Sequence, residues 1–198
     1  MIDTQCRAYF QKMVFDPVTK ILIRSNLQPI HLTCLALIAG LLVPIFTVTQ
    51  RPILALVFLA LSGSLDILDG SLARKSSTSS NQGAVLDIFF DRIVEVSIIT
   101  GFYVRDVQHH GLFCFAMLAS ILLCICSFLV VGIFEKNQSE KSFHYSTGLI
   151  ERTEAFLFFA LMILLPDKLP LLAVVFALLV TYTAIRRISQ FIQRADKA

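Results

Sequence analysis

The sequence predicts an all-α integral membrane protein with six transmembrane helices, preceded by an N-terminal amphipathic helix on the membrane surface. The first observation is the composition: 56% of the 198 residues are hydrophobic and the mean hydropathy is +0.76. Such values exclude an ordinary soluble domain and a disordered chain. The second is the presence of long stretches without a charged residue, since a transmembrane helix needs ~20 mostly apolar residues. These stretches cover residues 27–50, 111–134 and 169–185.

Residues 1–26 are expected to form an amphipathic segment that lies on the membrane surface. Phe10 and Phe15 would face the lipid, whereas Lys12 would face water. Pro17 should break or kink this helix, because proline lacks the backbone N–H and clashes with the preceding turn. A plain soluble extension is the alternative interpretation.

The six spans follow one another without a long linker. They are expected at about residues 30–49, 53–73, 84–104, 112–134, 148–165 and 169–190. Short polar segments separate them, and Pro166 ends the fifth span. Residues 27–198 would therefore form one six-helix core, and the whole chain, residues 1–198, a single domain.

The distribution of basic residues supports this count and orients the chain. With the N-terminus in the cytoplasm, 13 of the 17 Lys and Arg residues lie in cytoplasmic segments, three lie in external loops, and Arg92 lies within a span. Cytoplasmic loops of membrane proteins carry an excess of Lys and Arg. The sequence therefore predicts a multi-pass protein with both termini in the cytoplasm, in the cell inner membrane if the source is bacterial.

Four aspartates fall within the second and third spans. Asp66 and Asp69 are three residues apart, and Asp87 and Asp91 are four apart, so each pair shares one helix face. The first pair lies late in a helix that runs toward the cytoplasm, and the second lies early in the helix that returns. Antiparallel packing should bring all four carboxylates together near the cytoplasmic surface. Ionisable residues inside a membrane are costly, so they indicate a functional site.

Such a group of carboxylates predicts bound cations, because the four charges repel one another otherwise. Oxygen-only ligands suit Mg²⁺ or Mn²⁺ better than zinc or copper. Two such ions about 4 Å apart can clamp a diphosphate and stabilise the charge of a displacement at phosphorus. The site therefore fits chemistry on a diphosphate-containing substrate.

The third span also carries Arg92 and Glu95. Two interpretations stay open for them. They belong to the same site as the aspartates, or they form a structural salt bridge between helices.

The charged residues form part of a longer motif. In order it consists of Asp66, Asp69, Gly70, Ala73, Arg74, Gly83, Asp87 and Asp91. Both the residue types and the spacings resemble the signature of the CDP-alcohol phosphotransferase family. The signature covers residues 66–91, and the six-helix layout extends the resemblance over nearly the whole chain.

The resemblance implies a role for each position of the motif. The divalent ions, Mg²⁺ or Mn²⁺ and two in number, would be bound by Asp66, Asp69, Asp87 and Asp91. Asp91 would also be the general base that takes the proton of the acceptor hydroxyl. The CDP part of the donor would contact Asp69, Gly70, Ala73, Arg74 and Gly83. One departure precedes the first span, where Ile30 replaces the Asn that family members often carry after Pro29.

The implied reaction belongs to phospholipid biosynthesis. A phosphatidyl or related phosphoalkyl group would pass from a CDP-linked donor such as CDP-diacylglycerol to an alcohol acceptor, with release of CMP. Residues 148–154 are similar to a stretch in members that use phosphorylated polyols such as inositol phosphate or glycerol 3-phosphate. Arg152 and Lys136 are therefore candidates for acceptor binding, although a salt bridge of Arg152 to a neighbouring glutamate is an alternative.

Expected partners are the CDP-lipid, the alcohol acceptor, membrane lipid and, from the family, a second copy in a homodimer. No nucleic-acid partner is expected. A membrane prenyltransferase also binds Mg²⁺-diphosphate through aspartates, typically as Asn-Asp-x-x-Asp, and the Asp-Gly-x-x-Ala-Arg run argues against it. A transporter or a non-catalytic membrane protein would need carboxylates near mid-membrane on broken helices. Metal-dependent release of CMP from a CDP-lipid discriminates among these classes.

Overall fold

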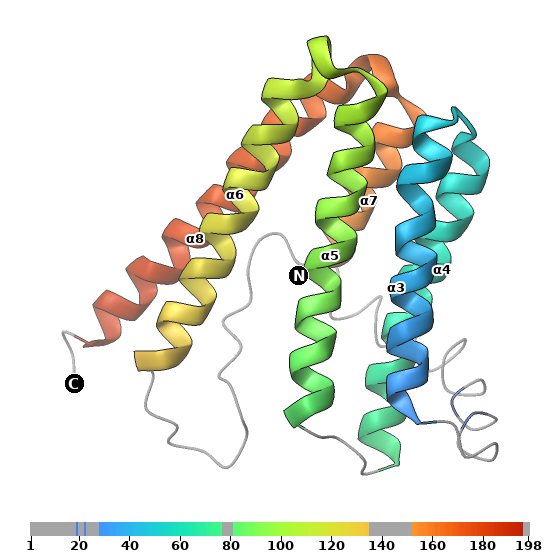
Figure 1. Cartoon of the computed structure of the whole chain (residues 1–198). Coiled ribbons are helices and arrows are strands. Elements are labelled where there is room, and N and C mark those ends of the chain that lie inside the picture. Colours follow the sequence, from blue (N-terminus) through green and yellow to red (C-terminus); the bar gives the residue numbers. More distant parts are fainter. Residues whose placement is uncertain (1–18, 20–21, 23–27, 77–80, 135–151, 196–198) are drawn as a thin grey trace. The chain divides into compact units, whose positions relative to one another are not determined.

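The computed structural model describes residues 19, 22, 28–76, 81–134 and 152–195, and within them every regular element is helical. The chain divides into two compact units, Met1–Arg105 and Asp106–Ala198. The first unit holds α3 (Pro29–Val48), α4 (Pro52–Lys75) and α5 (Asn81–Arg105) (Figure 1). The second holds α6 (Val107–Phe134), α7 (Arg152–Leu164), the short 3-10 helix η2 (Pro166–Lys168) and α8 (Leu169–Ala195).

Prolines fix where two helices of the first unit begin. Pro29 opens α3 and Pro52 opens α4. The first turn of a helix tolerates proline, because its backbone N–H groups have no partner within the helix. Between these helices the chain reverses at Gln50, whose φ of 54° is left-handed. The first two predicted spans are therefore joined by a tight turn.

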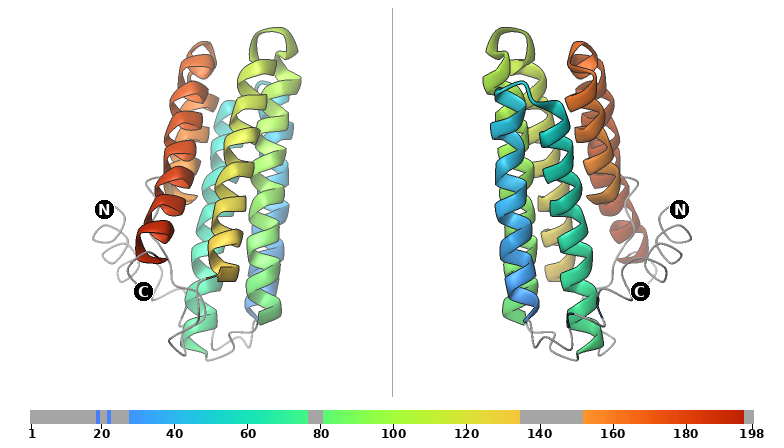
Figure 2. Two further views of the ribbon diagram at one scale, coloured as in Figure 1. Left: turned by 90° about the vertical axis from the view of Figure 1, so that its left-hand side faces the viewer. Right: turned by 90° about the vertical axis from the view of Figure 1, so that its right-hand side faces the viewer.

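The helix α3 packs against both α4 and α5, and the three helices run side by side in both views of Figure 2. Ser62 on α4 donates a buried hydrogen bond of 2.8 Å to the carbonyl oxygen of Ala36 on α3. A Cβ atom built on Gly40 would lie 2.5 Å from Val94 Cγ2 on α5. Small residues let membrane helices approach closely, and Gly40 lets α3 approach α5 at this point.

A second close contact lies further along the same two helices. A Cβ atom on Gly101 of α5 would lie 2.7 Å from Pro44 Cβ and 2.8 Å from Pro44 Cα on α3. The two contacts together fix the rotation of α5 relative to α3. Because Ser62 fixes α4 on the same helix, α3 determines how the other two helices face each other.

In the second unit, α6 packs along α8, and α7 contacts α8. Arg187 on α8 joins the first pair. Its Nη1 donates to the carbonyl oxygen of Cys124 and to Ser127 Oγ, both at 3.0 Å, and its guanidinium lies 5.4 Å from the ring centre of Phe128. The ring of Phe176 on α8 meets two rings of α7, Phe158 and Phe159, at 5.6 and 5.8 Å between centroids.

Asp106 explains why α6 begins earlier than expected. The backbone N–H of His109 donates a 3.0 Å hydrogen bond to Asp106 Oδ1, which is the geometry of a helix N-cap. The His109 ring also lies 2.9 Å from Asp106 Oδ2. The backbone hydrogen bond, followed by the side-chain contact, holds the pKa of Asp106 below its ordinary value of 3.8. The segment between the third and fourth predicted spans, 84–104 and 112–134, is therefore mostly the first turn of α6.

The expectation of a helical membrane protein is confirmed in its coarse form. Among the described residues, four helical segments are long and apolar enough to cross a membrane: Pro29–Val48, Pro52–Lys75, Val107–Phe134 and Pro166–Arg194. The other two helices do not meet that criterion, because α5 carries the charged residues of the motif and α7 has only 13 residues. The count of six spans and the single domain stay predictions.

The amphipathic N-terminal segment lies outside the described residues, except for Thr19 and Leu22. Thr19 is buried, and Leu22 packs on a cluster formed by Leu32 of α3 with Leu68 and Leu72 of α4. This cluster covers the same turns of α4 that carry the aspartates. Whether residues 1–26 form a surface helix stays a prediction.

Candidate metal centre and donor site

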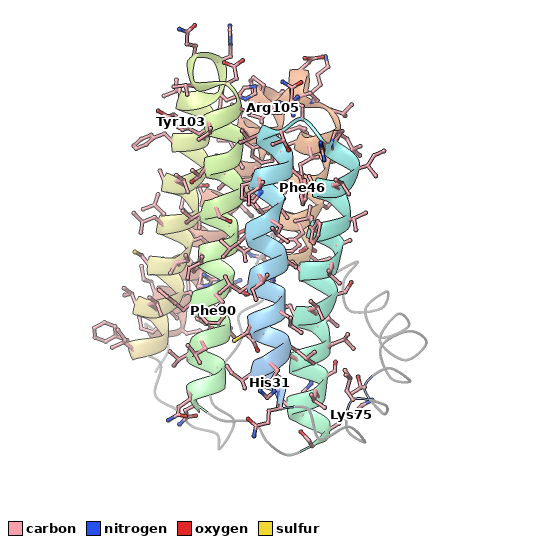
Figure 3. The ribbon with its side chains drawn as sticks, turned by 45° about the vertical axis from the view of Figure 1, so that its right-hand side comes forward. His31, Phe46, Lys75, Phe90, Tyr103 and Arg105 are labelled. Carbon is pink, nitrogen blue, oxygen red and sulfur yellow. The ribbon has the colours of Figure 1, made fainter. Side chains whose placement is uncertain are left out.

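The candidate site lies at one end of the first unit, where α4 finishes and α5 starts. Figure 3 places His31 and Lys75 at this end and Arg105 at the opposite end. Asp69 precedes Lys75 by six residues, which is about 9 Å along a helix at 1.5 Å per residue. The motif residues of both helices therefore belong to the same end of the unit, as their order along the chain predicted.

Three of the four aspartates converge. Ligand oxygens of Asp66 and Asp69 on α4 and of Asp87 on α5 all lie within 4.8 Å of one another. Asp69 is buried, with 5% of its surface exposed, and the other two are half-buried. Three carboxylates at this separation, coming from two helices, form an all-oxygen ligand set that fits Mg²⁺ or Mn²⁺. The residues present therefore could hold a divalent metal ion.

The fourth aspartate occupies a different position. Asp91 lies one helical turn beyond Asp87 on α5 and is not one of the three converging residues. Its side chain is 16% exposed. Among the described residues it is therefore the motif carboxylate that stands next to the cluster rather than in it.

Gly70 lies beside the arginine that follows it by one turn. A Cβ atom on Gly70 would lie 3.4 Å from Arg74 Nη1, an ordinary van der Waals contact. Arg74 Nη2 is also 3.5 Å from Ser71 Oγ, and the Arg74 side chain is exposed. An exposed guanidinium on the aspartate-bearing end of α4 is suited to binding phosphate.

The remaining motif positions lie on the same two helices. Ala73 is half-buried on α4, and Gly83 is half-buried in the first turn of α5. Pro29 and Ile30, where the sequence departs from the family pattern, open α3 at the same end of the unit. Ile30 is half-buried, and an isoleucine offers no polar group at the place where family members often carry Asn.

Arg92 and Glu95 form a salt bridge, but within α5 rather than between helices. Arg92 Nη1 lies 2.6 Å from Glu95 Oε2, three residues along the same helix. The Glu95 side chain is 5% exposed and that of Arg92 is 32% exposed. Arg92 Nη2 also lies 4.0 Å from Asp91 Oδ2. The three-residue spacing places both side chains on one face of α5, so the pair forms between neighbouring turns of one helix.

The acceptor candidates are divided between the described and the remaining residues. Arg152 begins α7 in the second unit, and its guanidinium lies 5.3 Å from the ring centre of Phe156. Lys136 and the residues before Arg152 in the 148–154 stretch lie outside the described residues.

The apolar helices and the three converging carboxylates define a class, namely a helical membrane protein that could hold a divalent metal ion. Comparison with known proteins agrees with this class. Residues 26–186 match the family described as CDP-alcohol phosphatidyltransferase. The chain belongs to that family. The prediction of a CDP-alcohol phosphotransferase is therefore confirmed at the level of the family, together with its assignment as an integral membrane protein.

Four curated proteins match by sequence, and two of them are as follows. The phosphatidylinositol phosphate synthase of Corynebacterium glutamicum is 28% identical over 151 residues, which cover 72% of this chain and 65% of that protein. The inner membrane protein YnjF of Escherichia coli is 29% identical over 184 residues, which cover 89% of each chain. The chain thus spans about two thirds of the length of the first relative and most of the second.

Crystal structures of one further protein share the fold. The phosphatidylinositol phosphate synthase of Mycobacterium tuberculosis with CDP-DAG bound superimposes with a TM-score of 0.75 at 18% identity, over 90% of this chain and 93% of that one. The same protein in complex with manganese and citrate gives a TM-score of 0.67 at 20% identity. At this identity the likeness establishes the fold.

Proposed function

We propose that the chain transfers a phosphatidyl group from a CDP-linked lipid, such as CDP-diacylglycerol, to the hydroxyl of a phosphorylated polyol and releases CMP. The observation that carries the proposal is the convergence of Asp66, Asp69 and Asp87 within 4.8 Å at one end of the first unit. The family and the bound CDP-DAG in the mycobacterial structure support the donor. Inositol phosphate is favoured as acceptor, ahead of glycerol 3-phosphate, because the relatives in Corynebacterium and Mycobacterium are phosphatidylinositol phosphate synthases.

In this reaction the acceptor oxygen forms a bond to the phosphorus of the phosphatidyl group, and the phosphorus–oxygen bond to CMP breaks. Asp66, Asp69, Asp87 and Asp91 would hold two ions, Mn²⁺ or Mg²⁺, whose charge would polarise the diphosphate and neutralise the departing CMP. Asp91 accepts the proton of the acceptor hydroxyl as general base. The CDP part of the donor contacts the α4 segment from Asp69 through Gly70 and Ala73 to Arg74, and Gly83 at the start of α5.

The residues beside the aspartates would bind the donor and the acceptor. The exposed guanidinium of Arg74 attracts the diphosphate of the donor, since a planar guanidinium forms paired hydrogen bonds with phosphate oxygens. The absence of a side chain at Gly70 lets a ligand approach the backbone of α4. On the acceptor side, Arg152 and Lys136 would bind the phosphate of the polyol.

The direct test is a transfer assay with purified protein in nanodiscs. CDP-diacylglycerol is supplied with Mn²⁺ or Mg²⁺ and a panel of acceptors, namely inositol phosphate, glycerol 3-phosphate, inositol and serine, and the lipid product is identified by mass. Transfer should require the metal and stop in EDTA, and Asp69→Asn should lack activity although it still inserts in the membrane. Wild-type transfer in EDTA would contradict the metal site. Use of a prenyl diphosphate in place of the CDP-lipid would favour a prenyltransferase, and cation flux without CMP release would favour a transporter.

The location and assembly are part of the same proposal. The charge distribution along the sequence supports cytoplasmic termini and a cytoplasmic active site. A homodimer in which each protomer holds its own aspartate set is proposed from the family resemblance alone. A monomer in nanodiscs with full activity would contradict the dimer.

A further inference from the structure

The salt bridge inside α5 places a fixed positive charge beside the fourth aspartate of the motif. The guanidinium of Arg92 lies between two carboxylates of its own helix, with Nη1 2.6 Å from Glu95 Oε2 and Nη2 4.0 Å from Asp91 Oδ2. The 2.6 Å contact is a short charge-assisted interaction. The 4.0 Å contact is too long for a hydrogen bond, so it attracts the Asp91 carboxylate without using one of its lone pairs.

Glu95 is placed to hold the guanidinium still. Its side chain is 5% exposed, and Val94, Ile98 and Ile99 around it on α5 are buried. A carboxylate in such surroundings is stable as an anion only beside a cation. Glu95 therefore restricts Arg92, whose own side chain is 32% exposed and would otherwise sample many rotamers.

We infer that Arg92, anchored by Glu95, is a positioning residue that orients the Asp91 carboxylate toward the acceptor hydroxyl. The inference rests on the proposed function, in which Asp91 is the general base. A general base has to lie within hydrogen-bond reach of the proton that it takes. A single aspartate on a helix face has two rotatable side-chain bonds, and the guanidinium beside it favours one orientation of the carboxylate. Arg92 and Glu95 do not contact substrate in this role and act only through Asp91.

A set of variants separates this role from a merely structural ion pair. Arg92→Met removes the cation and keeps the length of the side chain, but it leaves Glu95 buried without the Arg92 guanidinium. Adding Glu95→Gln removes that buried charge. A structural pair therefore predicts that the double variant regains both stability and the wild-type kcat. The positioning role predicts that stability returns while kcat stays low by about tenfold, the usual size for loss of a residue that orients a site group.

The other measurements exclude indirect effects. The donor KM and the affinity for Mn²⁺, followed by electron paramagnetic resonance of the free ion, should stay within about twofold of wild type. The three converging aspartates are intact, and the Asp91 carboxylate is still present as a fourth ligand and changes only its preferred orientation. Glu95→Gln alone should lower kcat, and it should lower kcat no further in the Arg92→Met background, since it acts through Arg92. Arg92→Lys should restore part of kcat. Arg105→Met, at the far end of the same helix, is the matched control and should behave as wild type.

The outcomes distinguish the inference from the function on which it rests. A wild-type protein that releases no CMP with any acceptor would remove both. An active wild type whose double variant is equally active would remove the inference alone. A parallel loss of Mn²⁺ affinity and kcat in Arg92→Met would also overturn it, because the loss of turnover would then follow from weaker metal binding and not from the orientation of the general base.

Discussion

At the scale of single residues, Asp91 is the motif aspartate that stands apart from the converging three. Asp91→Asn keeps the size of the side chain but removes the base, so turnover should fall by ~10² or more, the weight of general-base catalysis. The donor KM should change little, because Asp66, Asp69 and Asp87 still converge in this variant. The measurement is steady-state CMP release with each substrate varied. A variant that binds no CDP-lipid would show that Asp91 acts mainly as a metal ligand.

A second prediction at this scale concerns Arg152 and the binding of the acceptor. It is the first residue of α7, where the helix N–H groups already favour an anion. Arg152→Ala should reduce kcat/KM for a phosphorylated acceptor by about 10- to 100-fold, the loss expected for one charge-assisted contact. The donor KM should stay the same. Lys168→Ala in η2 is the control. An equal loss for the CDP-lipid, or a wild-type preference for an uncharged acceptor, would leave Arg152 as an interfacial anchor.

At the scale of helices, Gly40 tests the contact between α3 and α5. Gly40→Ala should raise helix propensity by ~1 kcal/mol, but its Cβ would lie 2.5 Å from Val94, which is 2% exposed and cannot easily move. Overpacking costs about 1–3 kcal/mol, so we expect the net effect to be a lower melting temperature. Because the chain has no tryptophan, circular dichroism is the suitable probe. Adding Val94→Ala should recover the loss, and a Gly40→Ala protein as stable as wild type would contradict this packing.

The N-cap of α6 gives a prediction for pH. The folded-state pKa of Asp106 lies below its ordinary value of 3.8, because the His109 backbone N–H and ring favour the charged form. The stabilisation is therefore complete above pH ~5 and is lost as the pH falls through the folded-state pKa. Asp106→Asn keeps the hydrogen-bond acceptor without the charge. The melting-temperature difference between wild type and this variant should shrink as the pH falls from about 5 to below 3.8. An identical acid profile for both proteins would exclude this role.

The sequence predicts these helices better than it predicts their mutual rotation. The motif spacing places Asp66 and Asp69 on one face of a helix, and a short connection brings Asp87 back beside them, so the cluster follows from periodicity and chain direction. The approach of Gly40 to Val94 depends on how α3 turns against α5, which no local pattern encodes.

Two further features could not be predicted for similar reasons. A salt bridge between helices was one of the two interpretations left open for Arg92 and Glu95, and only the structure shows that the two residues pair within α5. The bonds of Arg187 to Cys124 and Ser127 join segments 60 or more residues apart, so only the tertiary structure brings them together. A basic residue near the end of a span is more simply interpreted as an interfacial anchor.

At the scale of the whole molecule, the charge distribution predicts which side of the membrane each connection faces. In a cysteine-free background, Gln108→Cys in the first turn of α6 should react with a membrane-impermeant maleimide in intact cells. Gln193→Cys near the end of α8 should react only after permeabilisation. Both positions are exposed, so the difference reports sidedness. The reverse pattern would place the aspartate end outside the cell and contradict the positive-inside assignment.

The packing of α3 against α4 and α5 also has a consequence for how the protein is made. The helix that holds the other two is the first of the three to leave the ribosome, so α4 and α5 each meet an existing surface as they emerge. Once residue 105 has been translated, every aspartate of the motif has been synthesised together with the helix that aligns them. Domains tend to form from the N-terminal side during synthesis. Translation thus produces α3 before the helices that carry the aspartates. Carboxylates that would be costly in lipid on their own therefore enter the bilayer beside a helix that is already present.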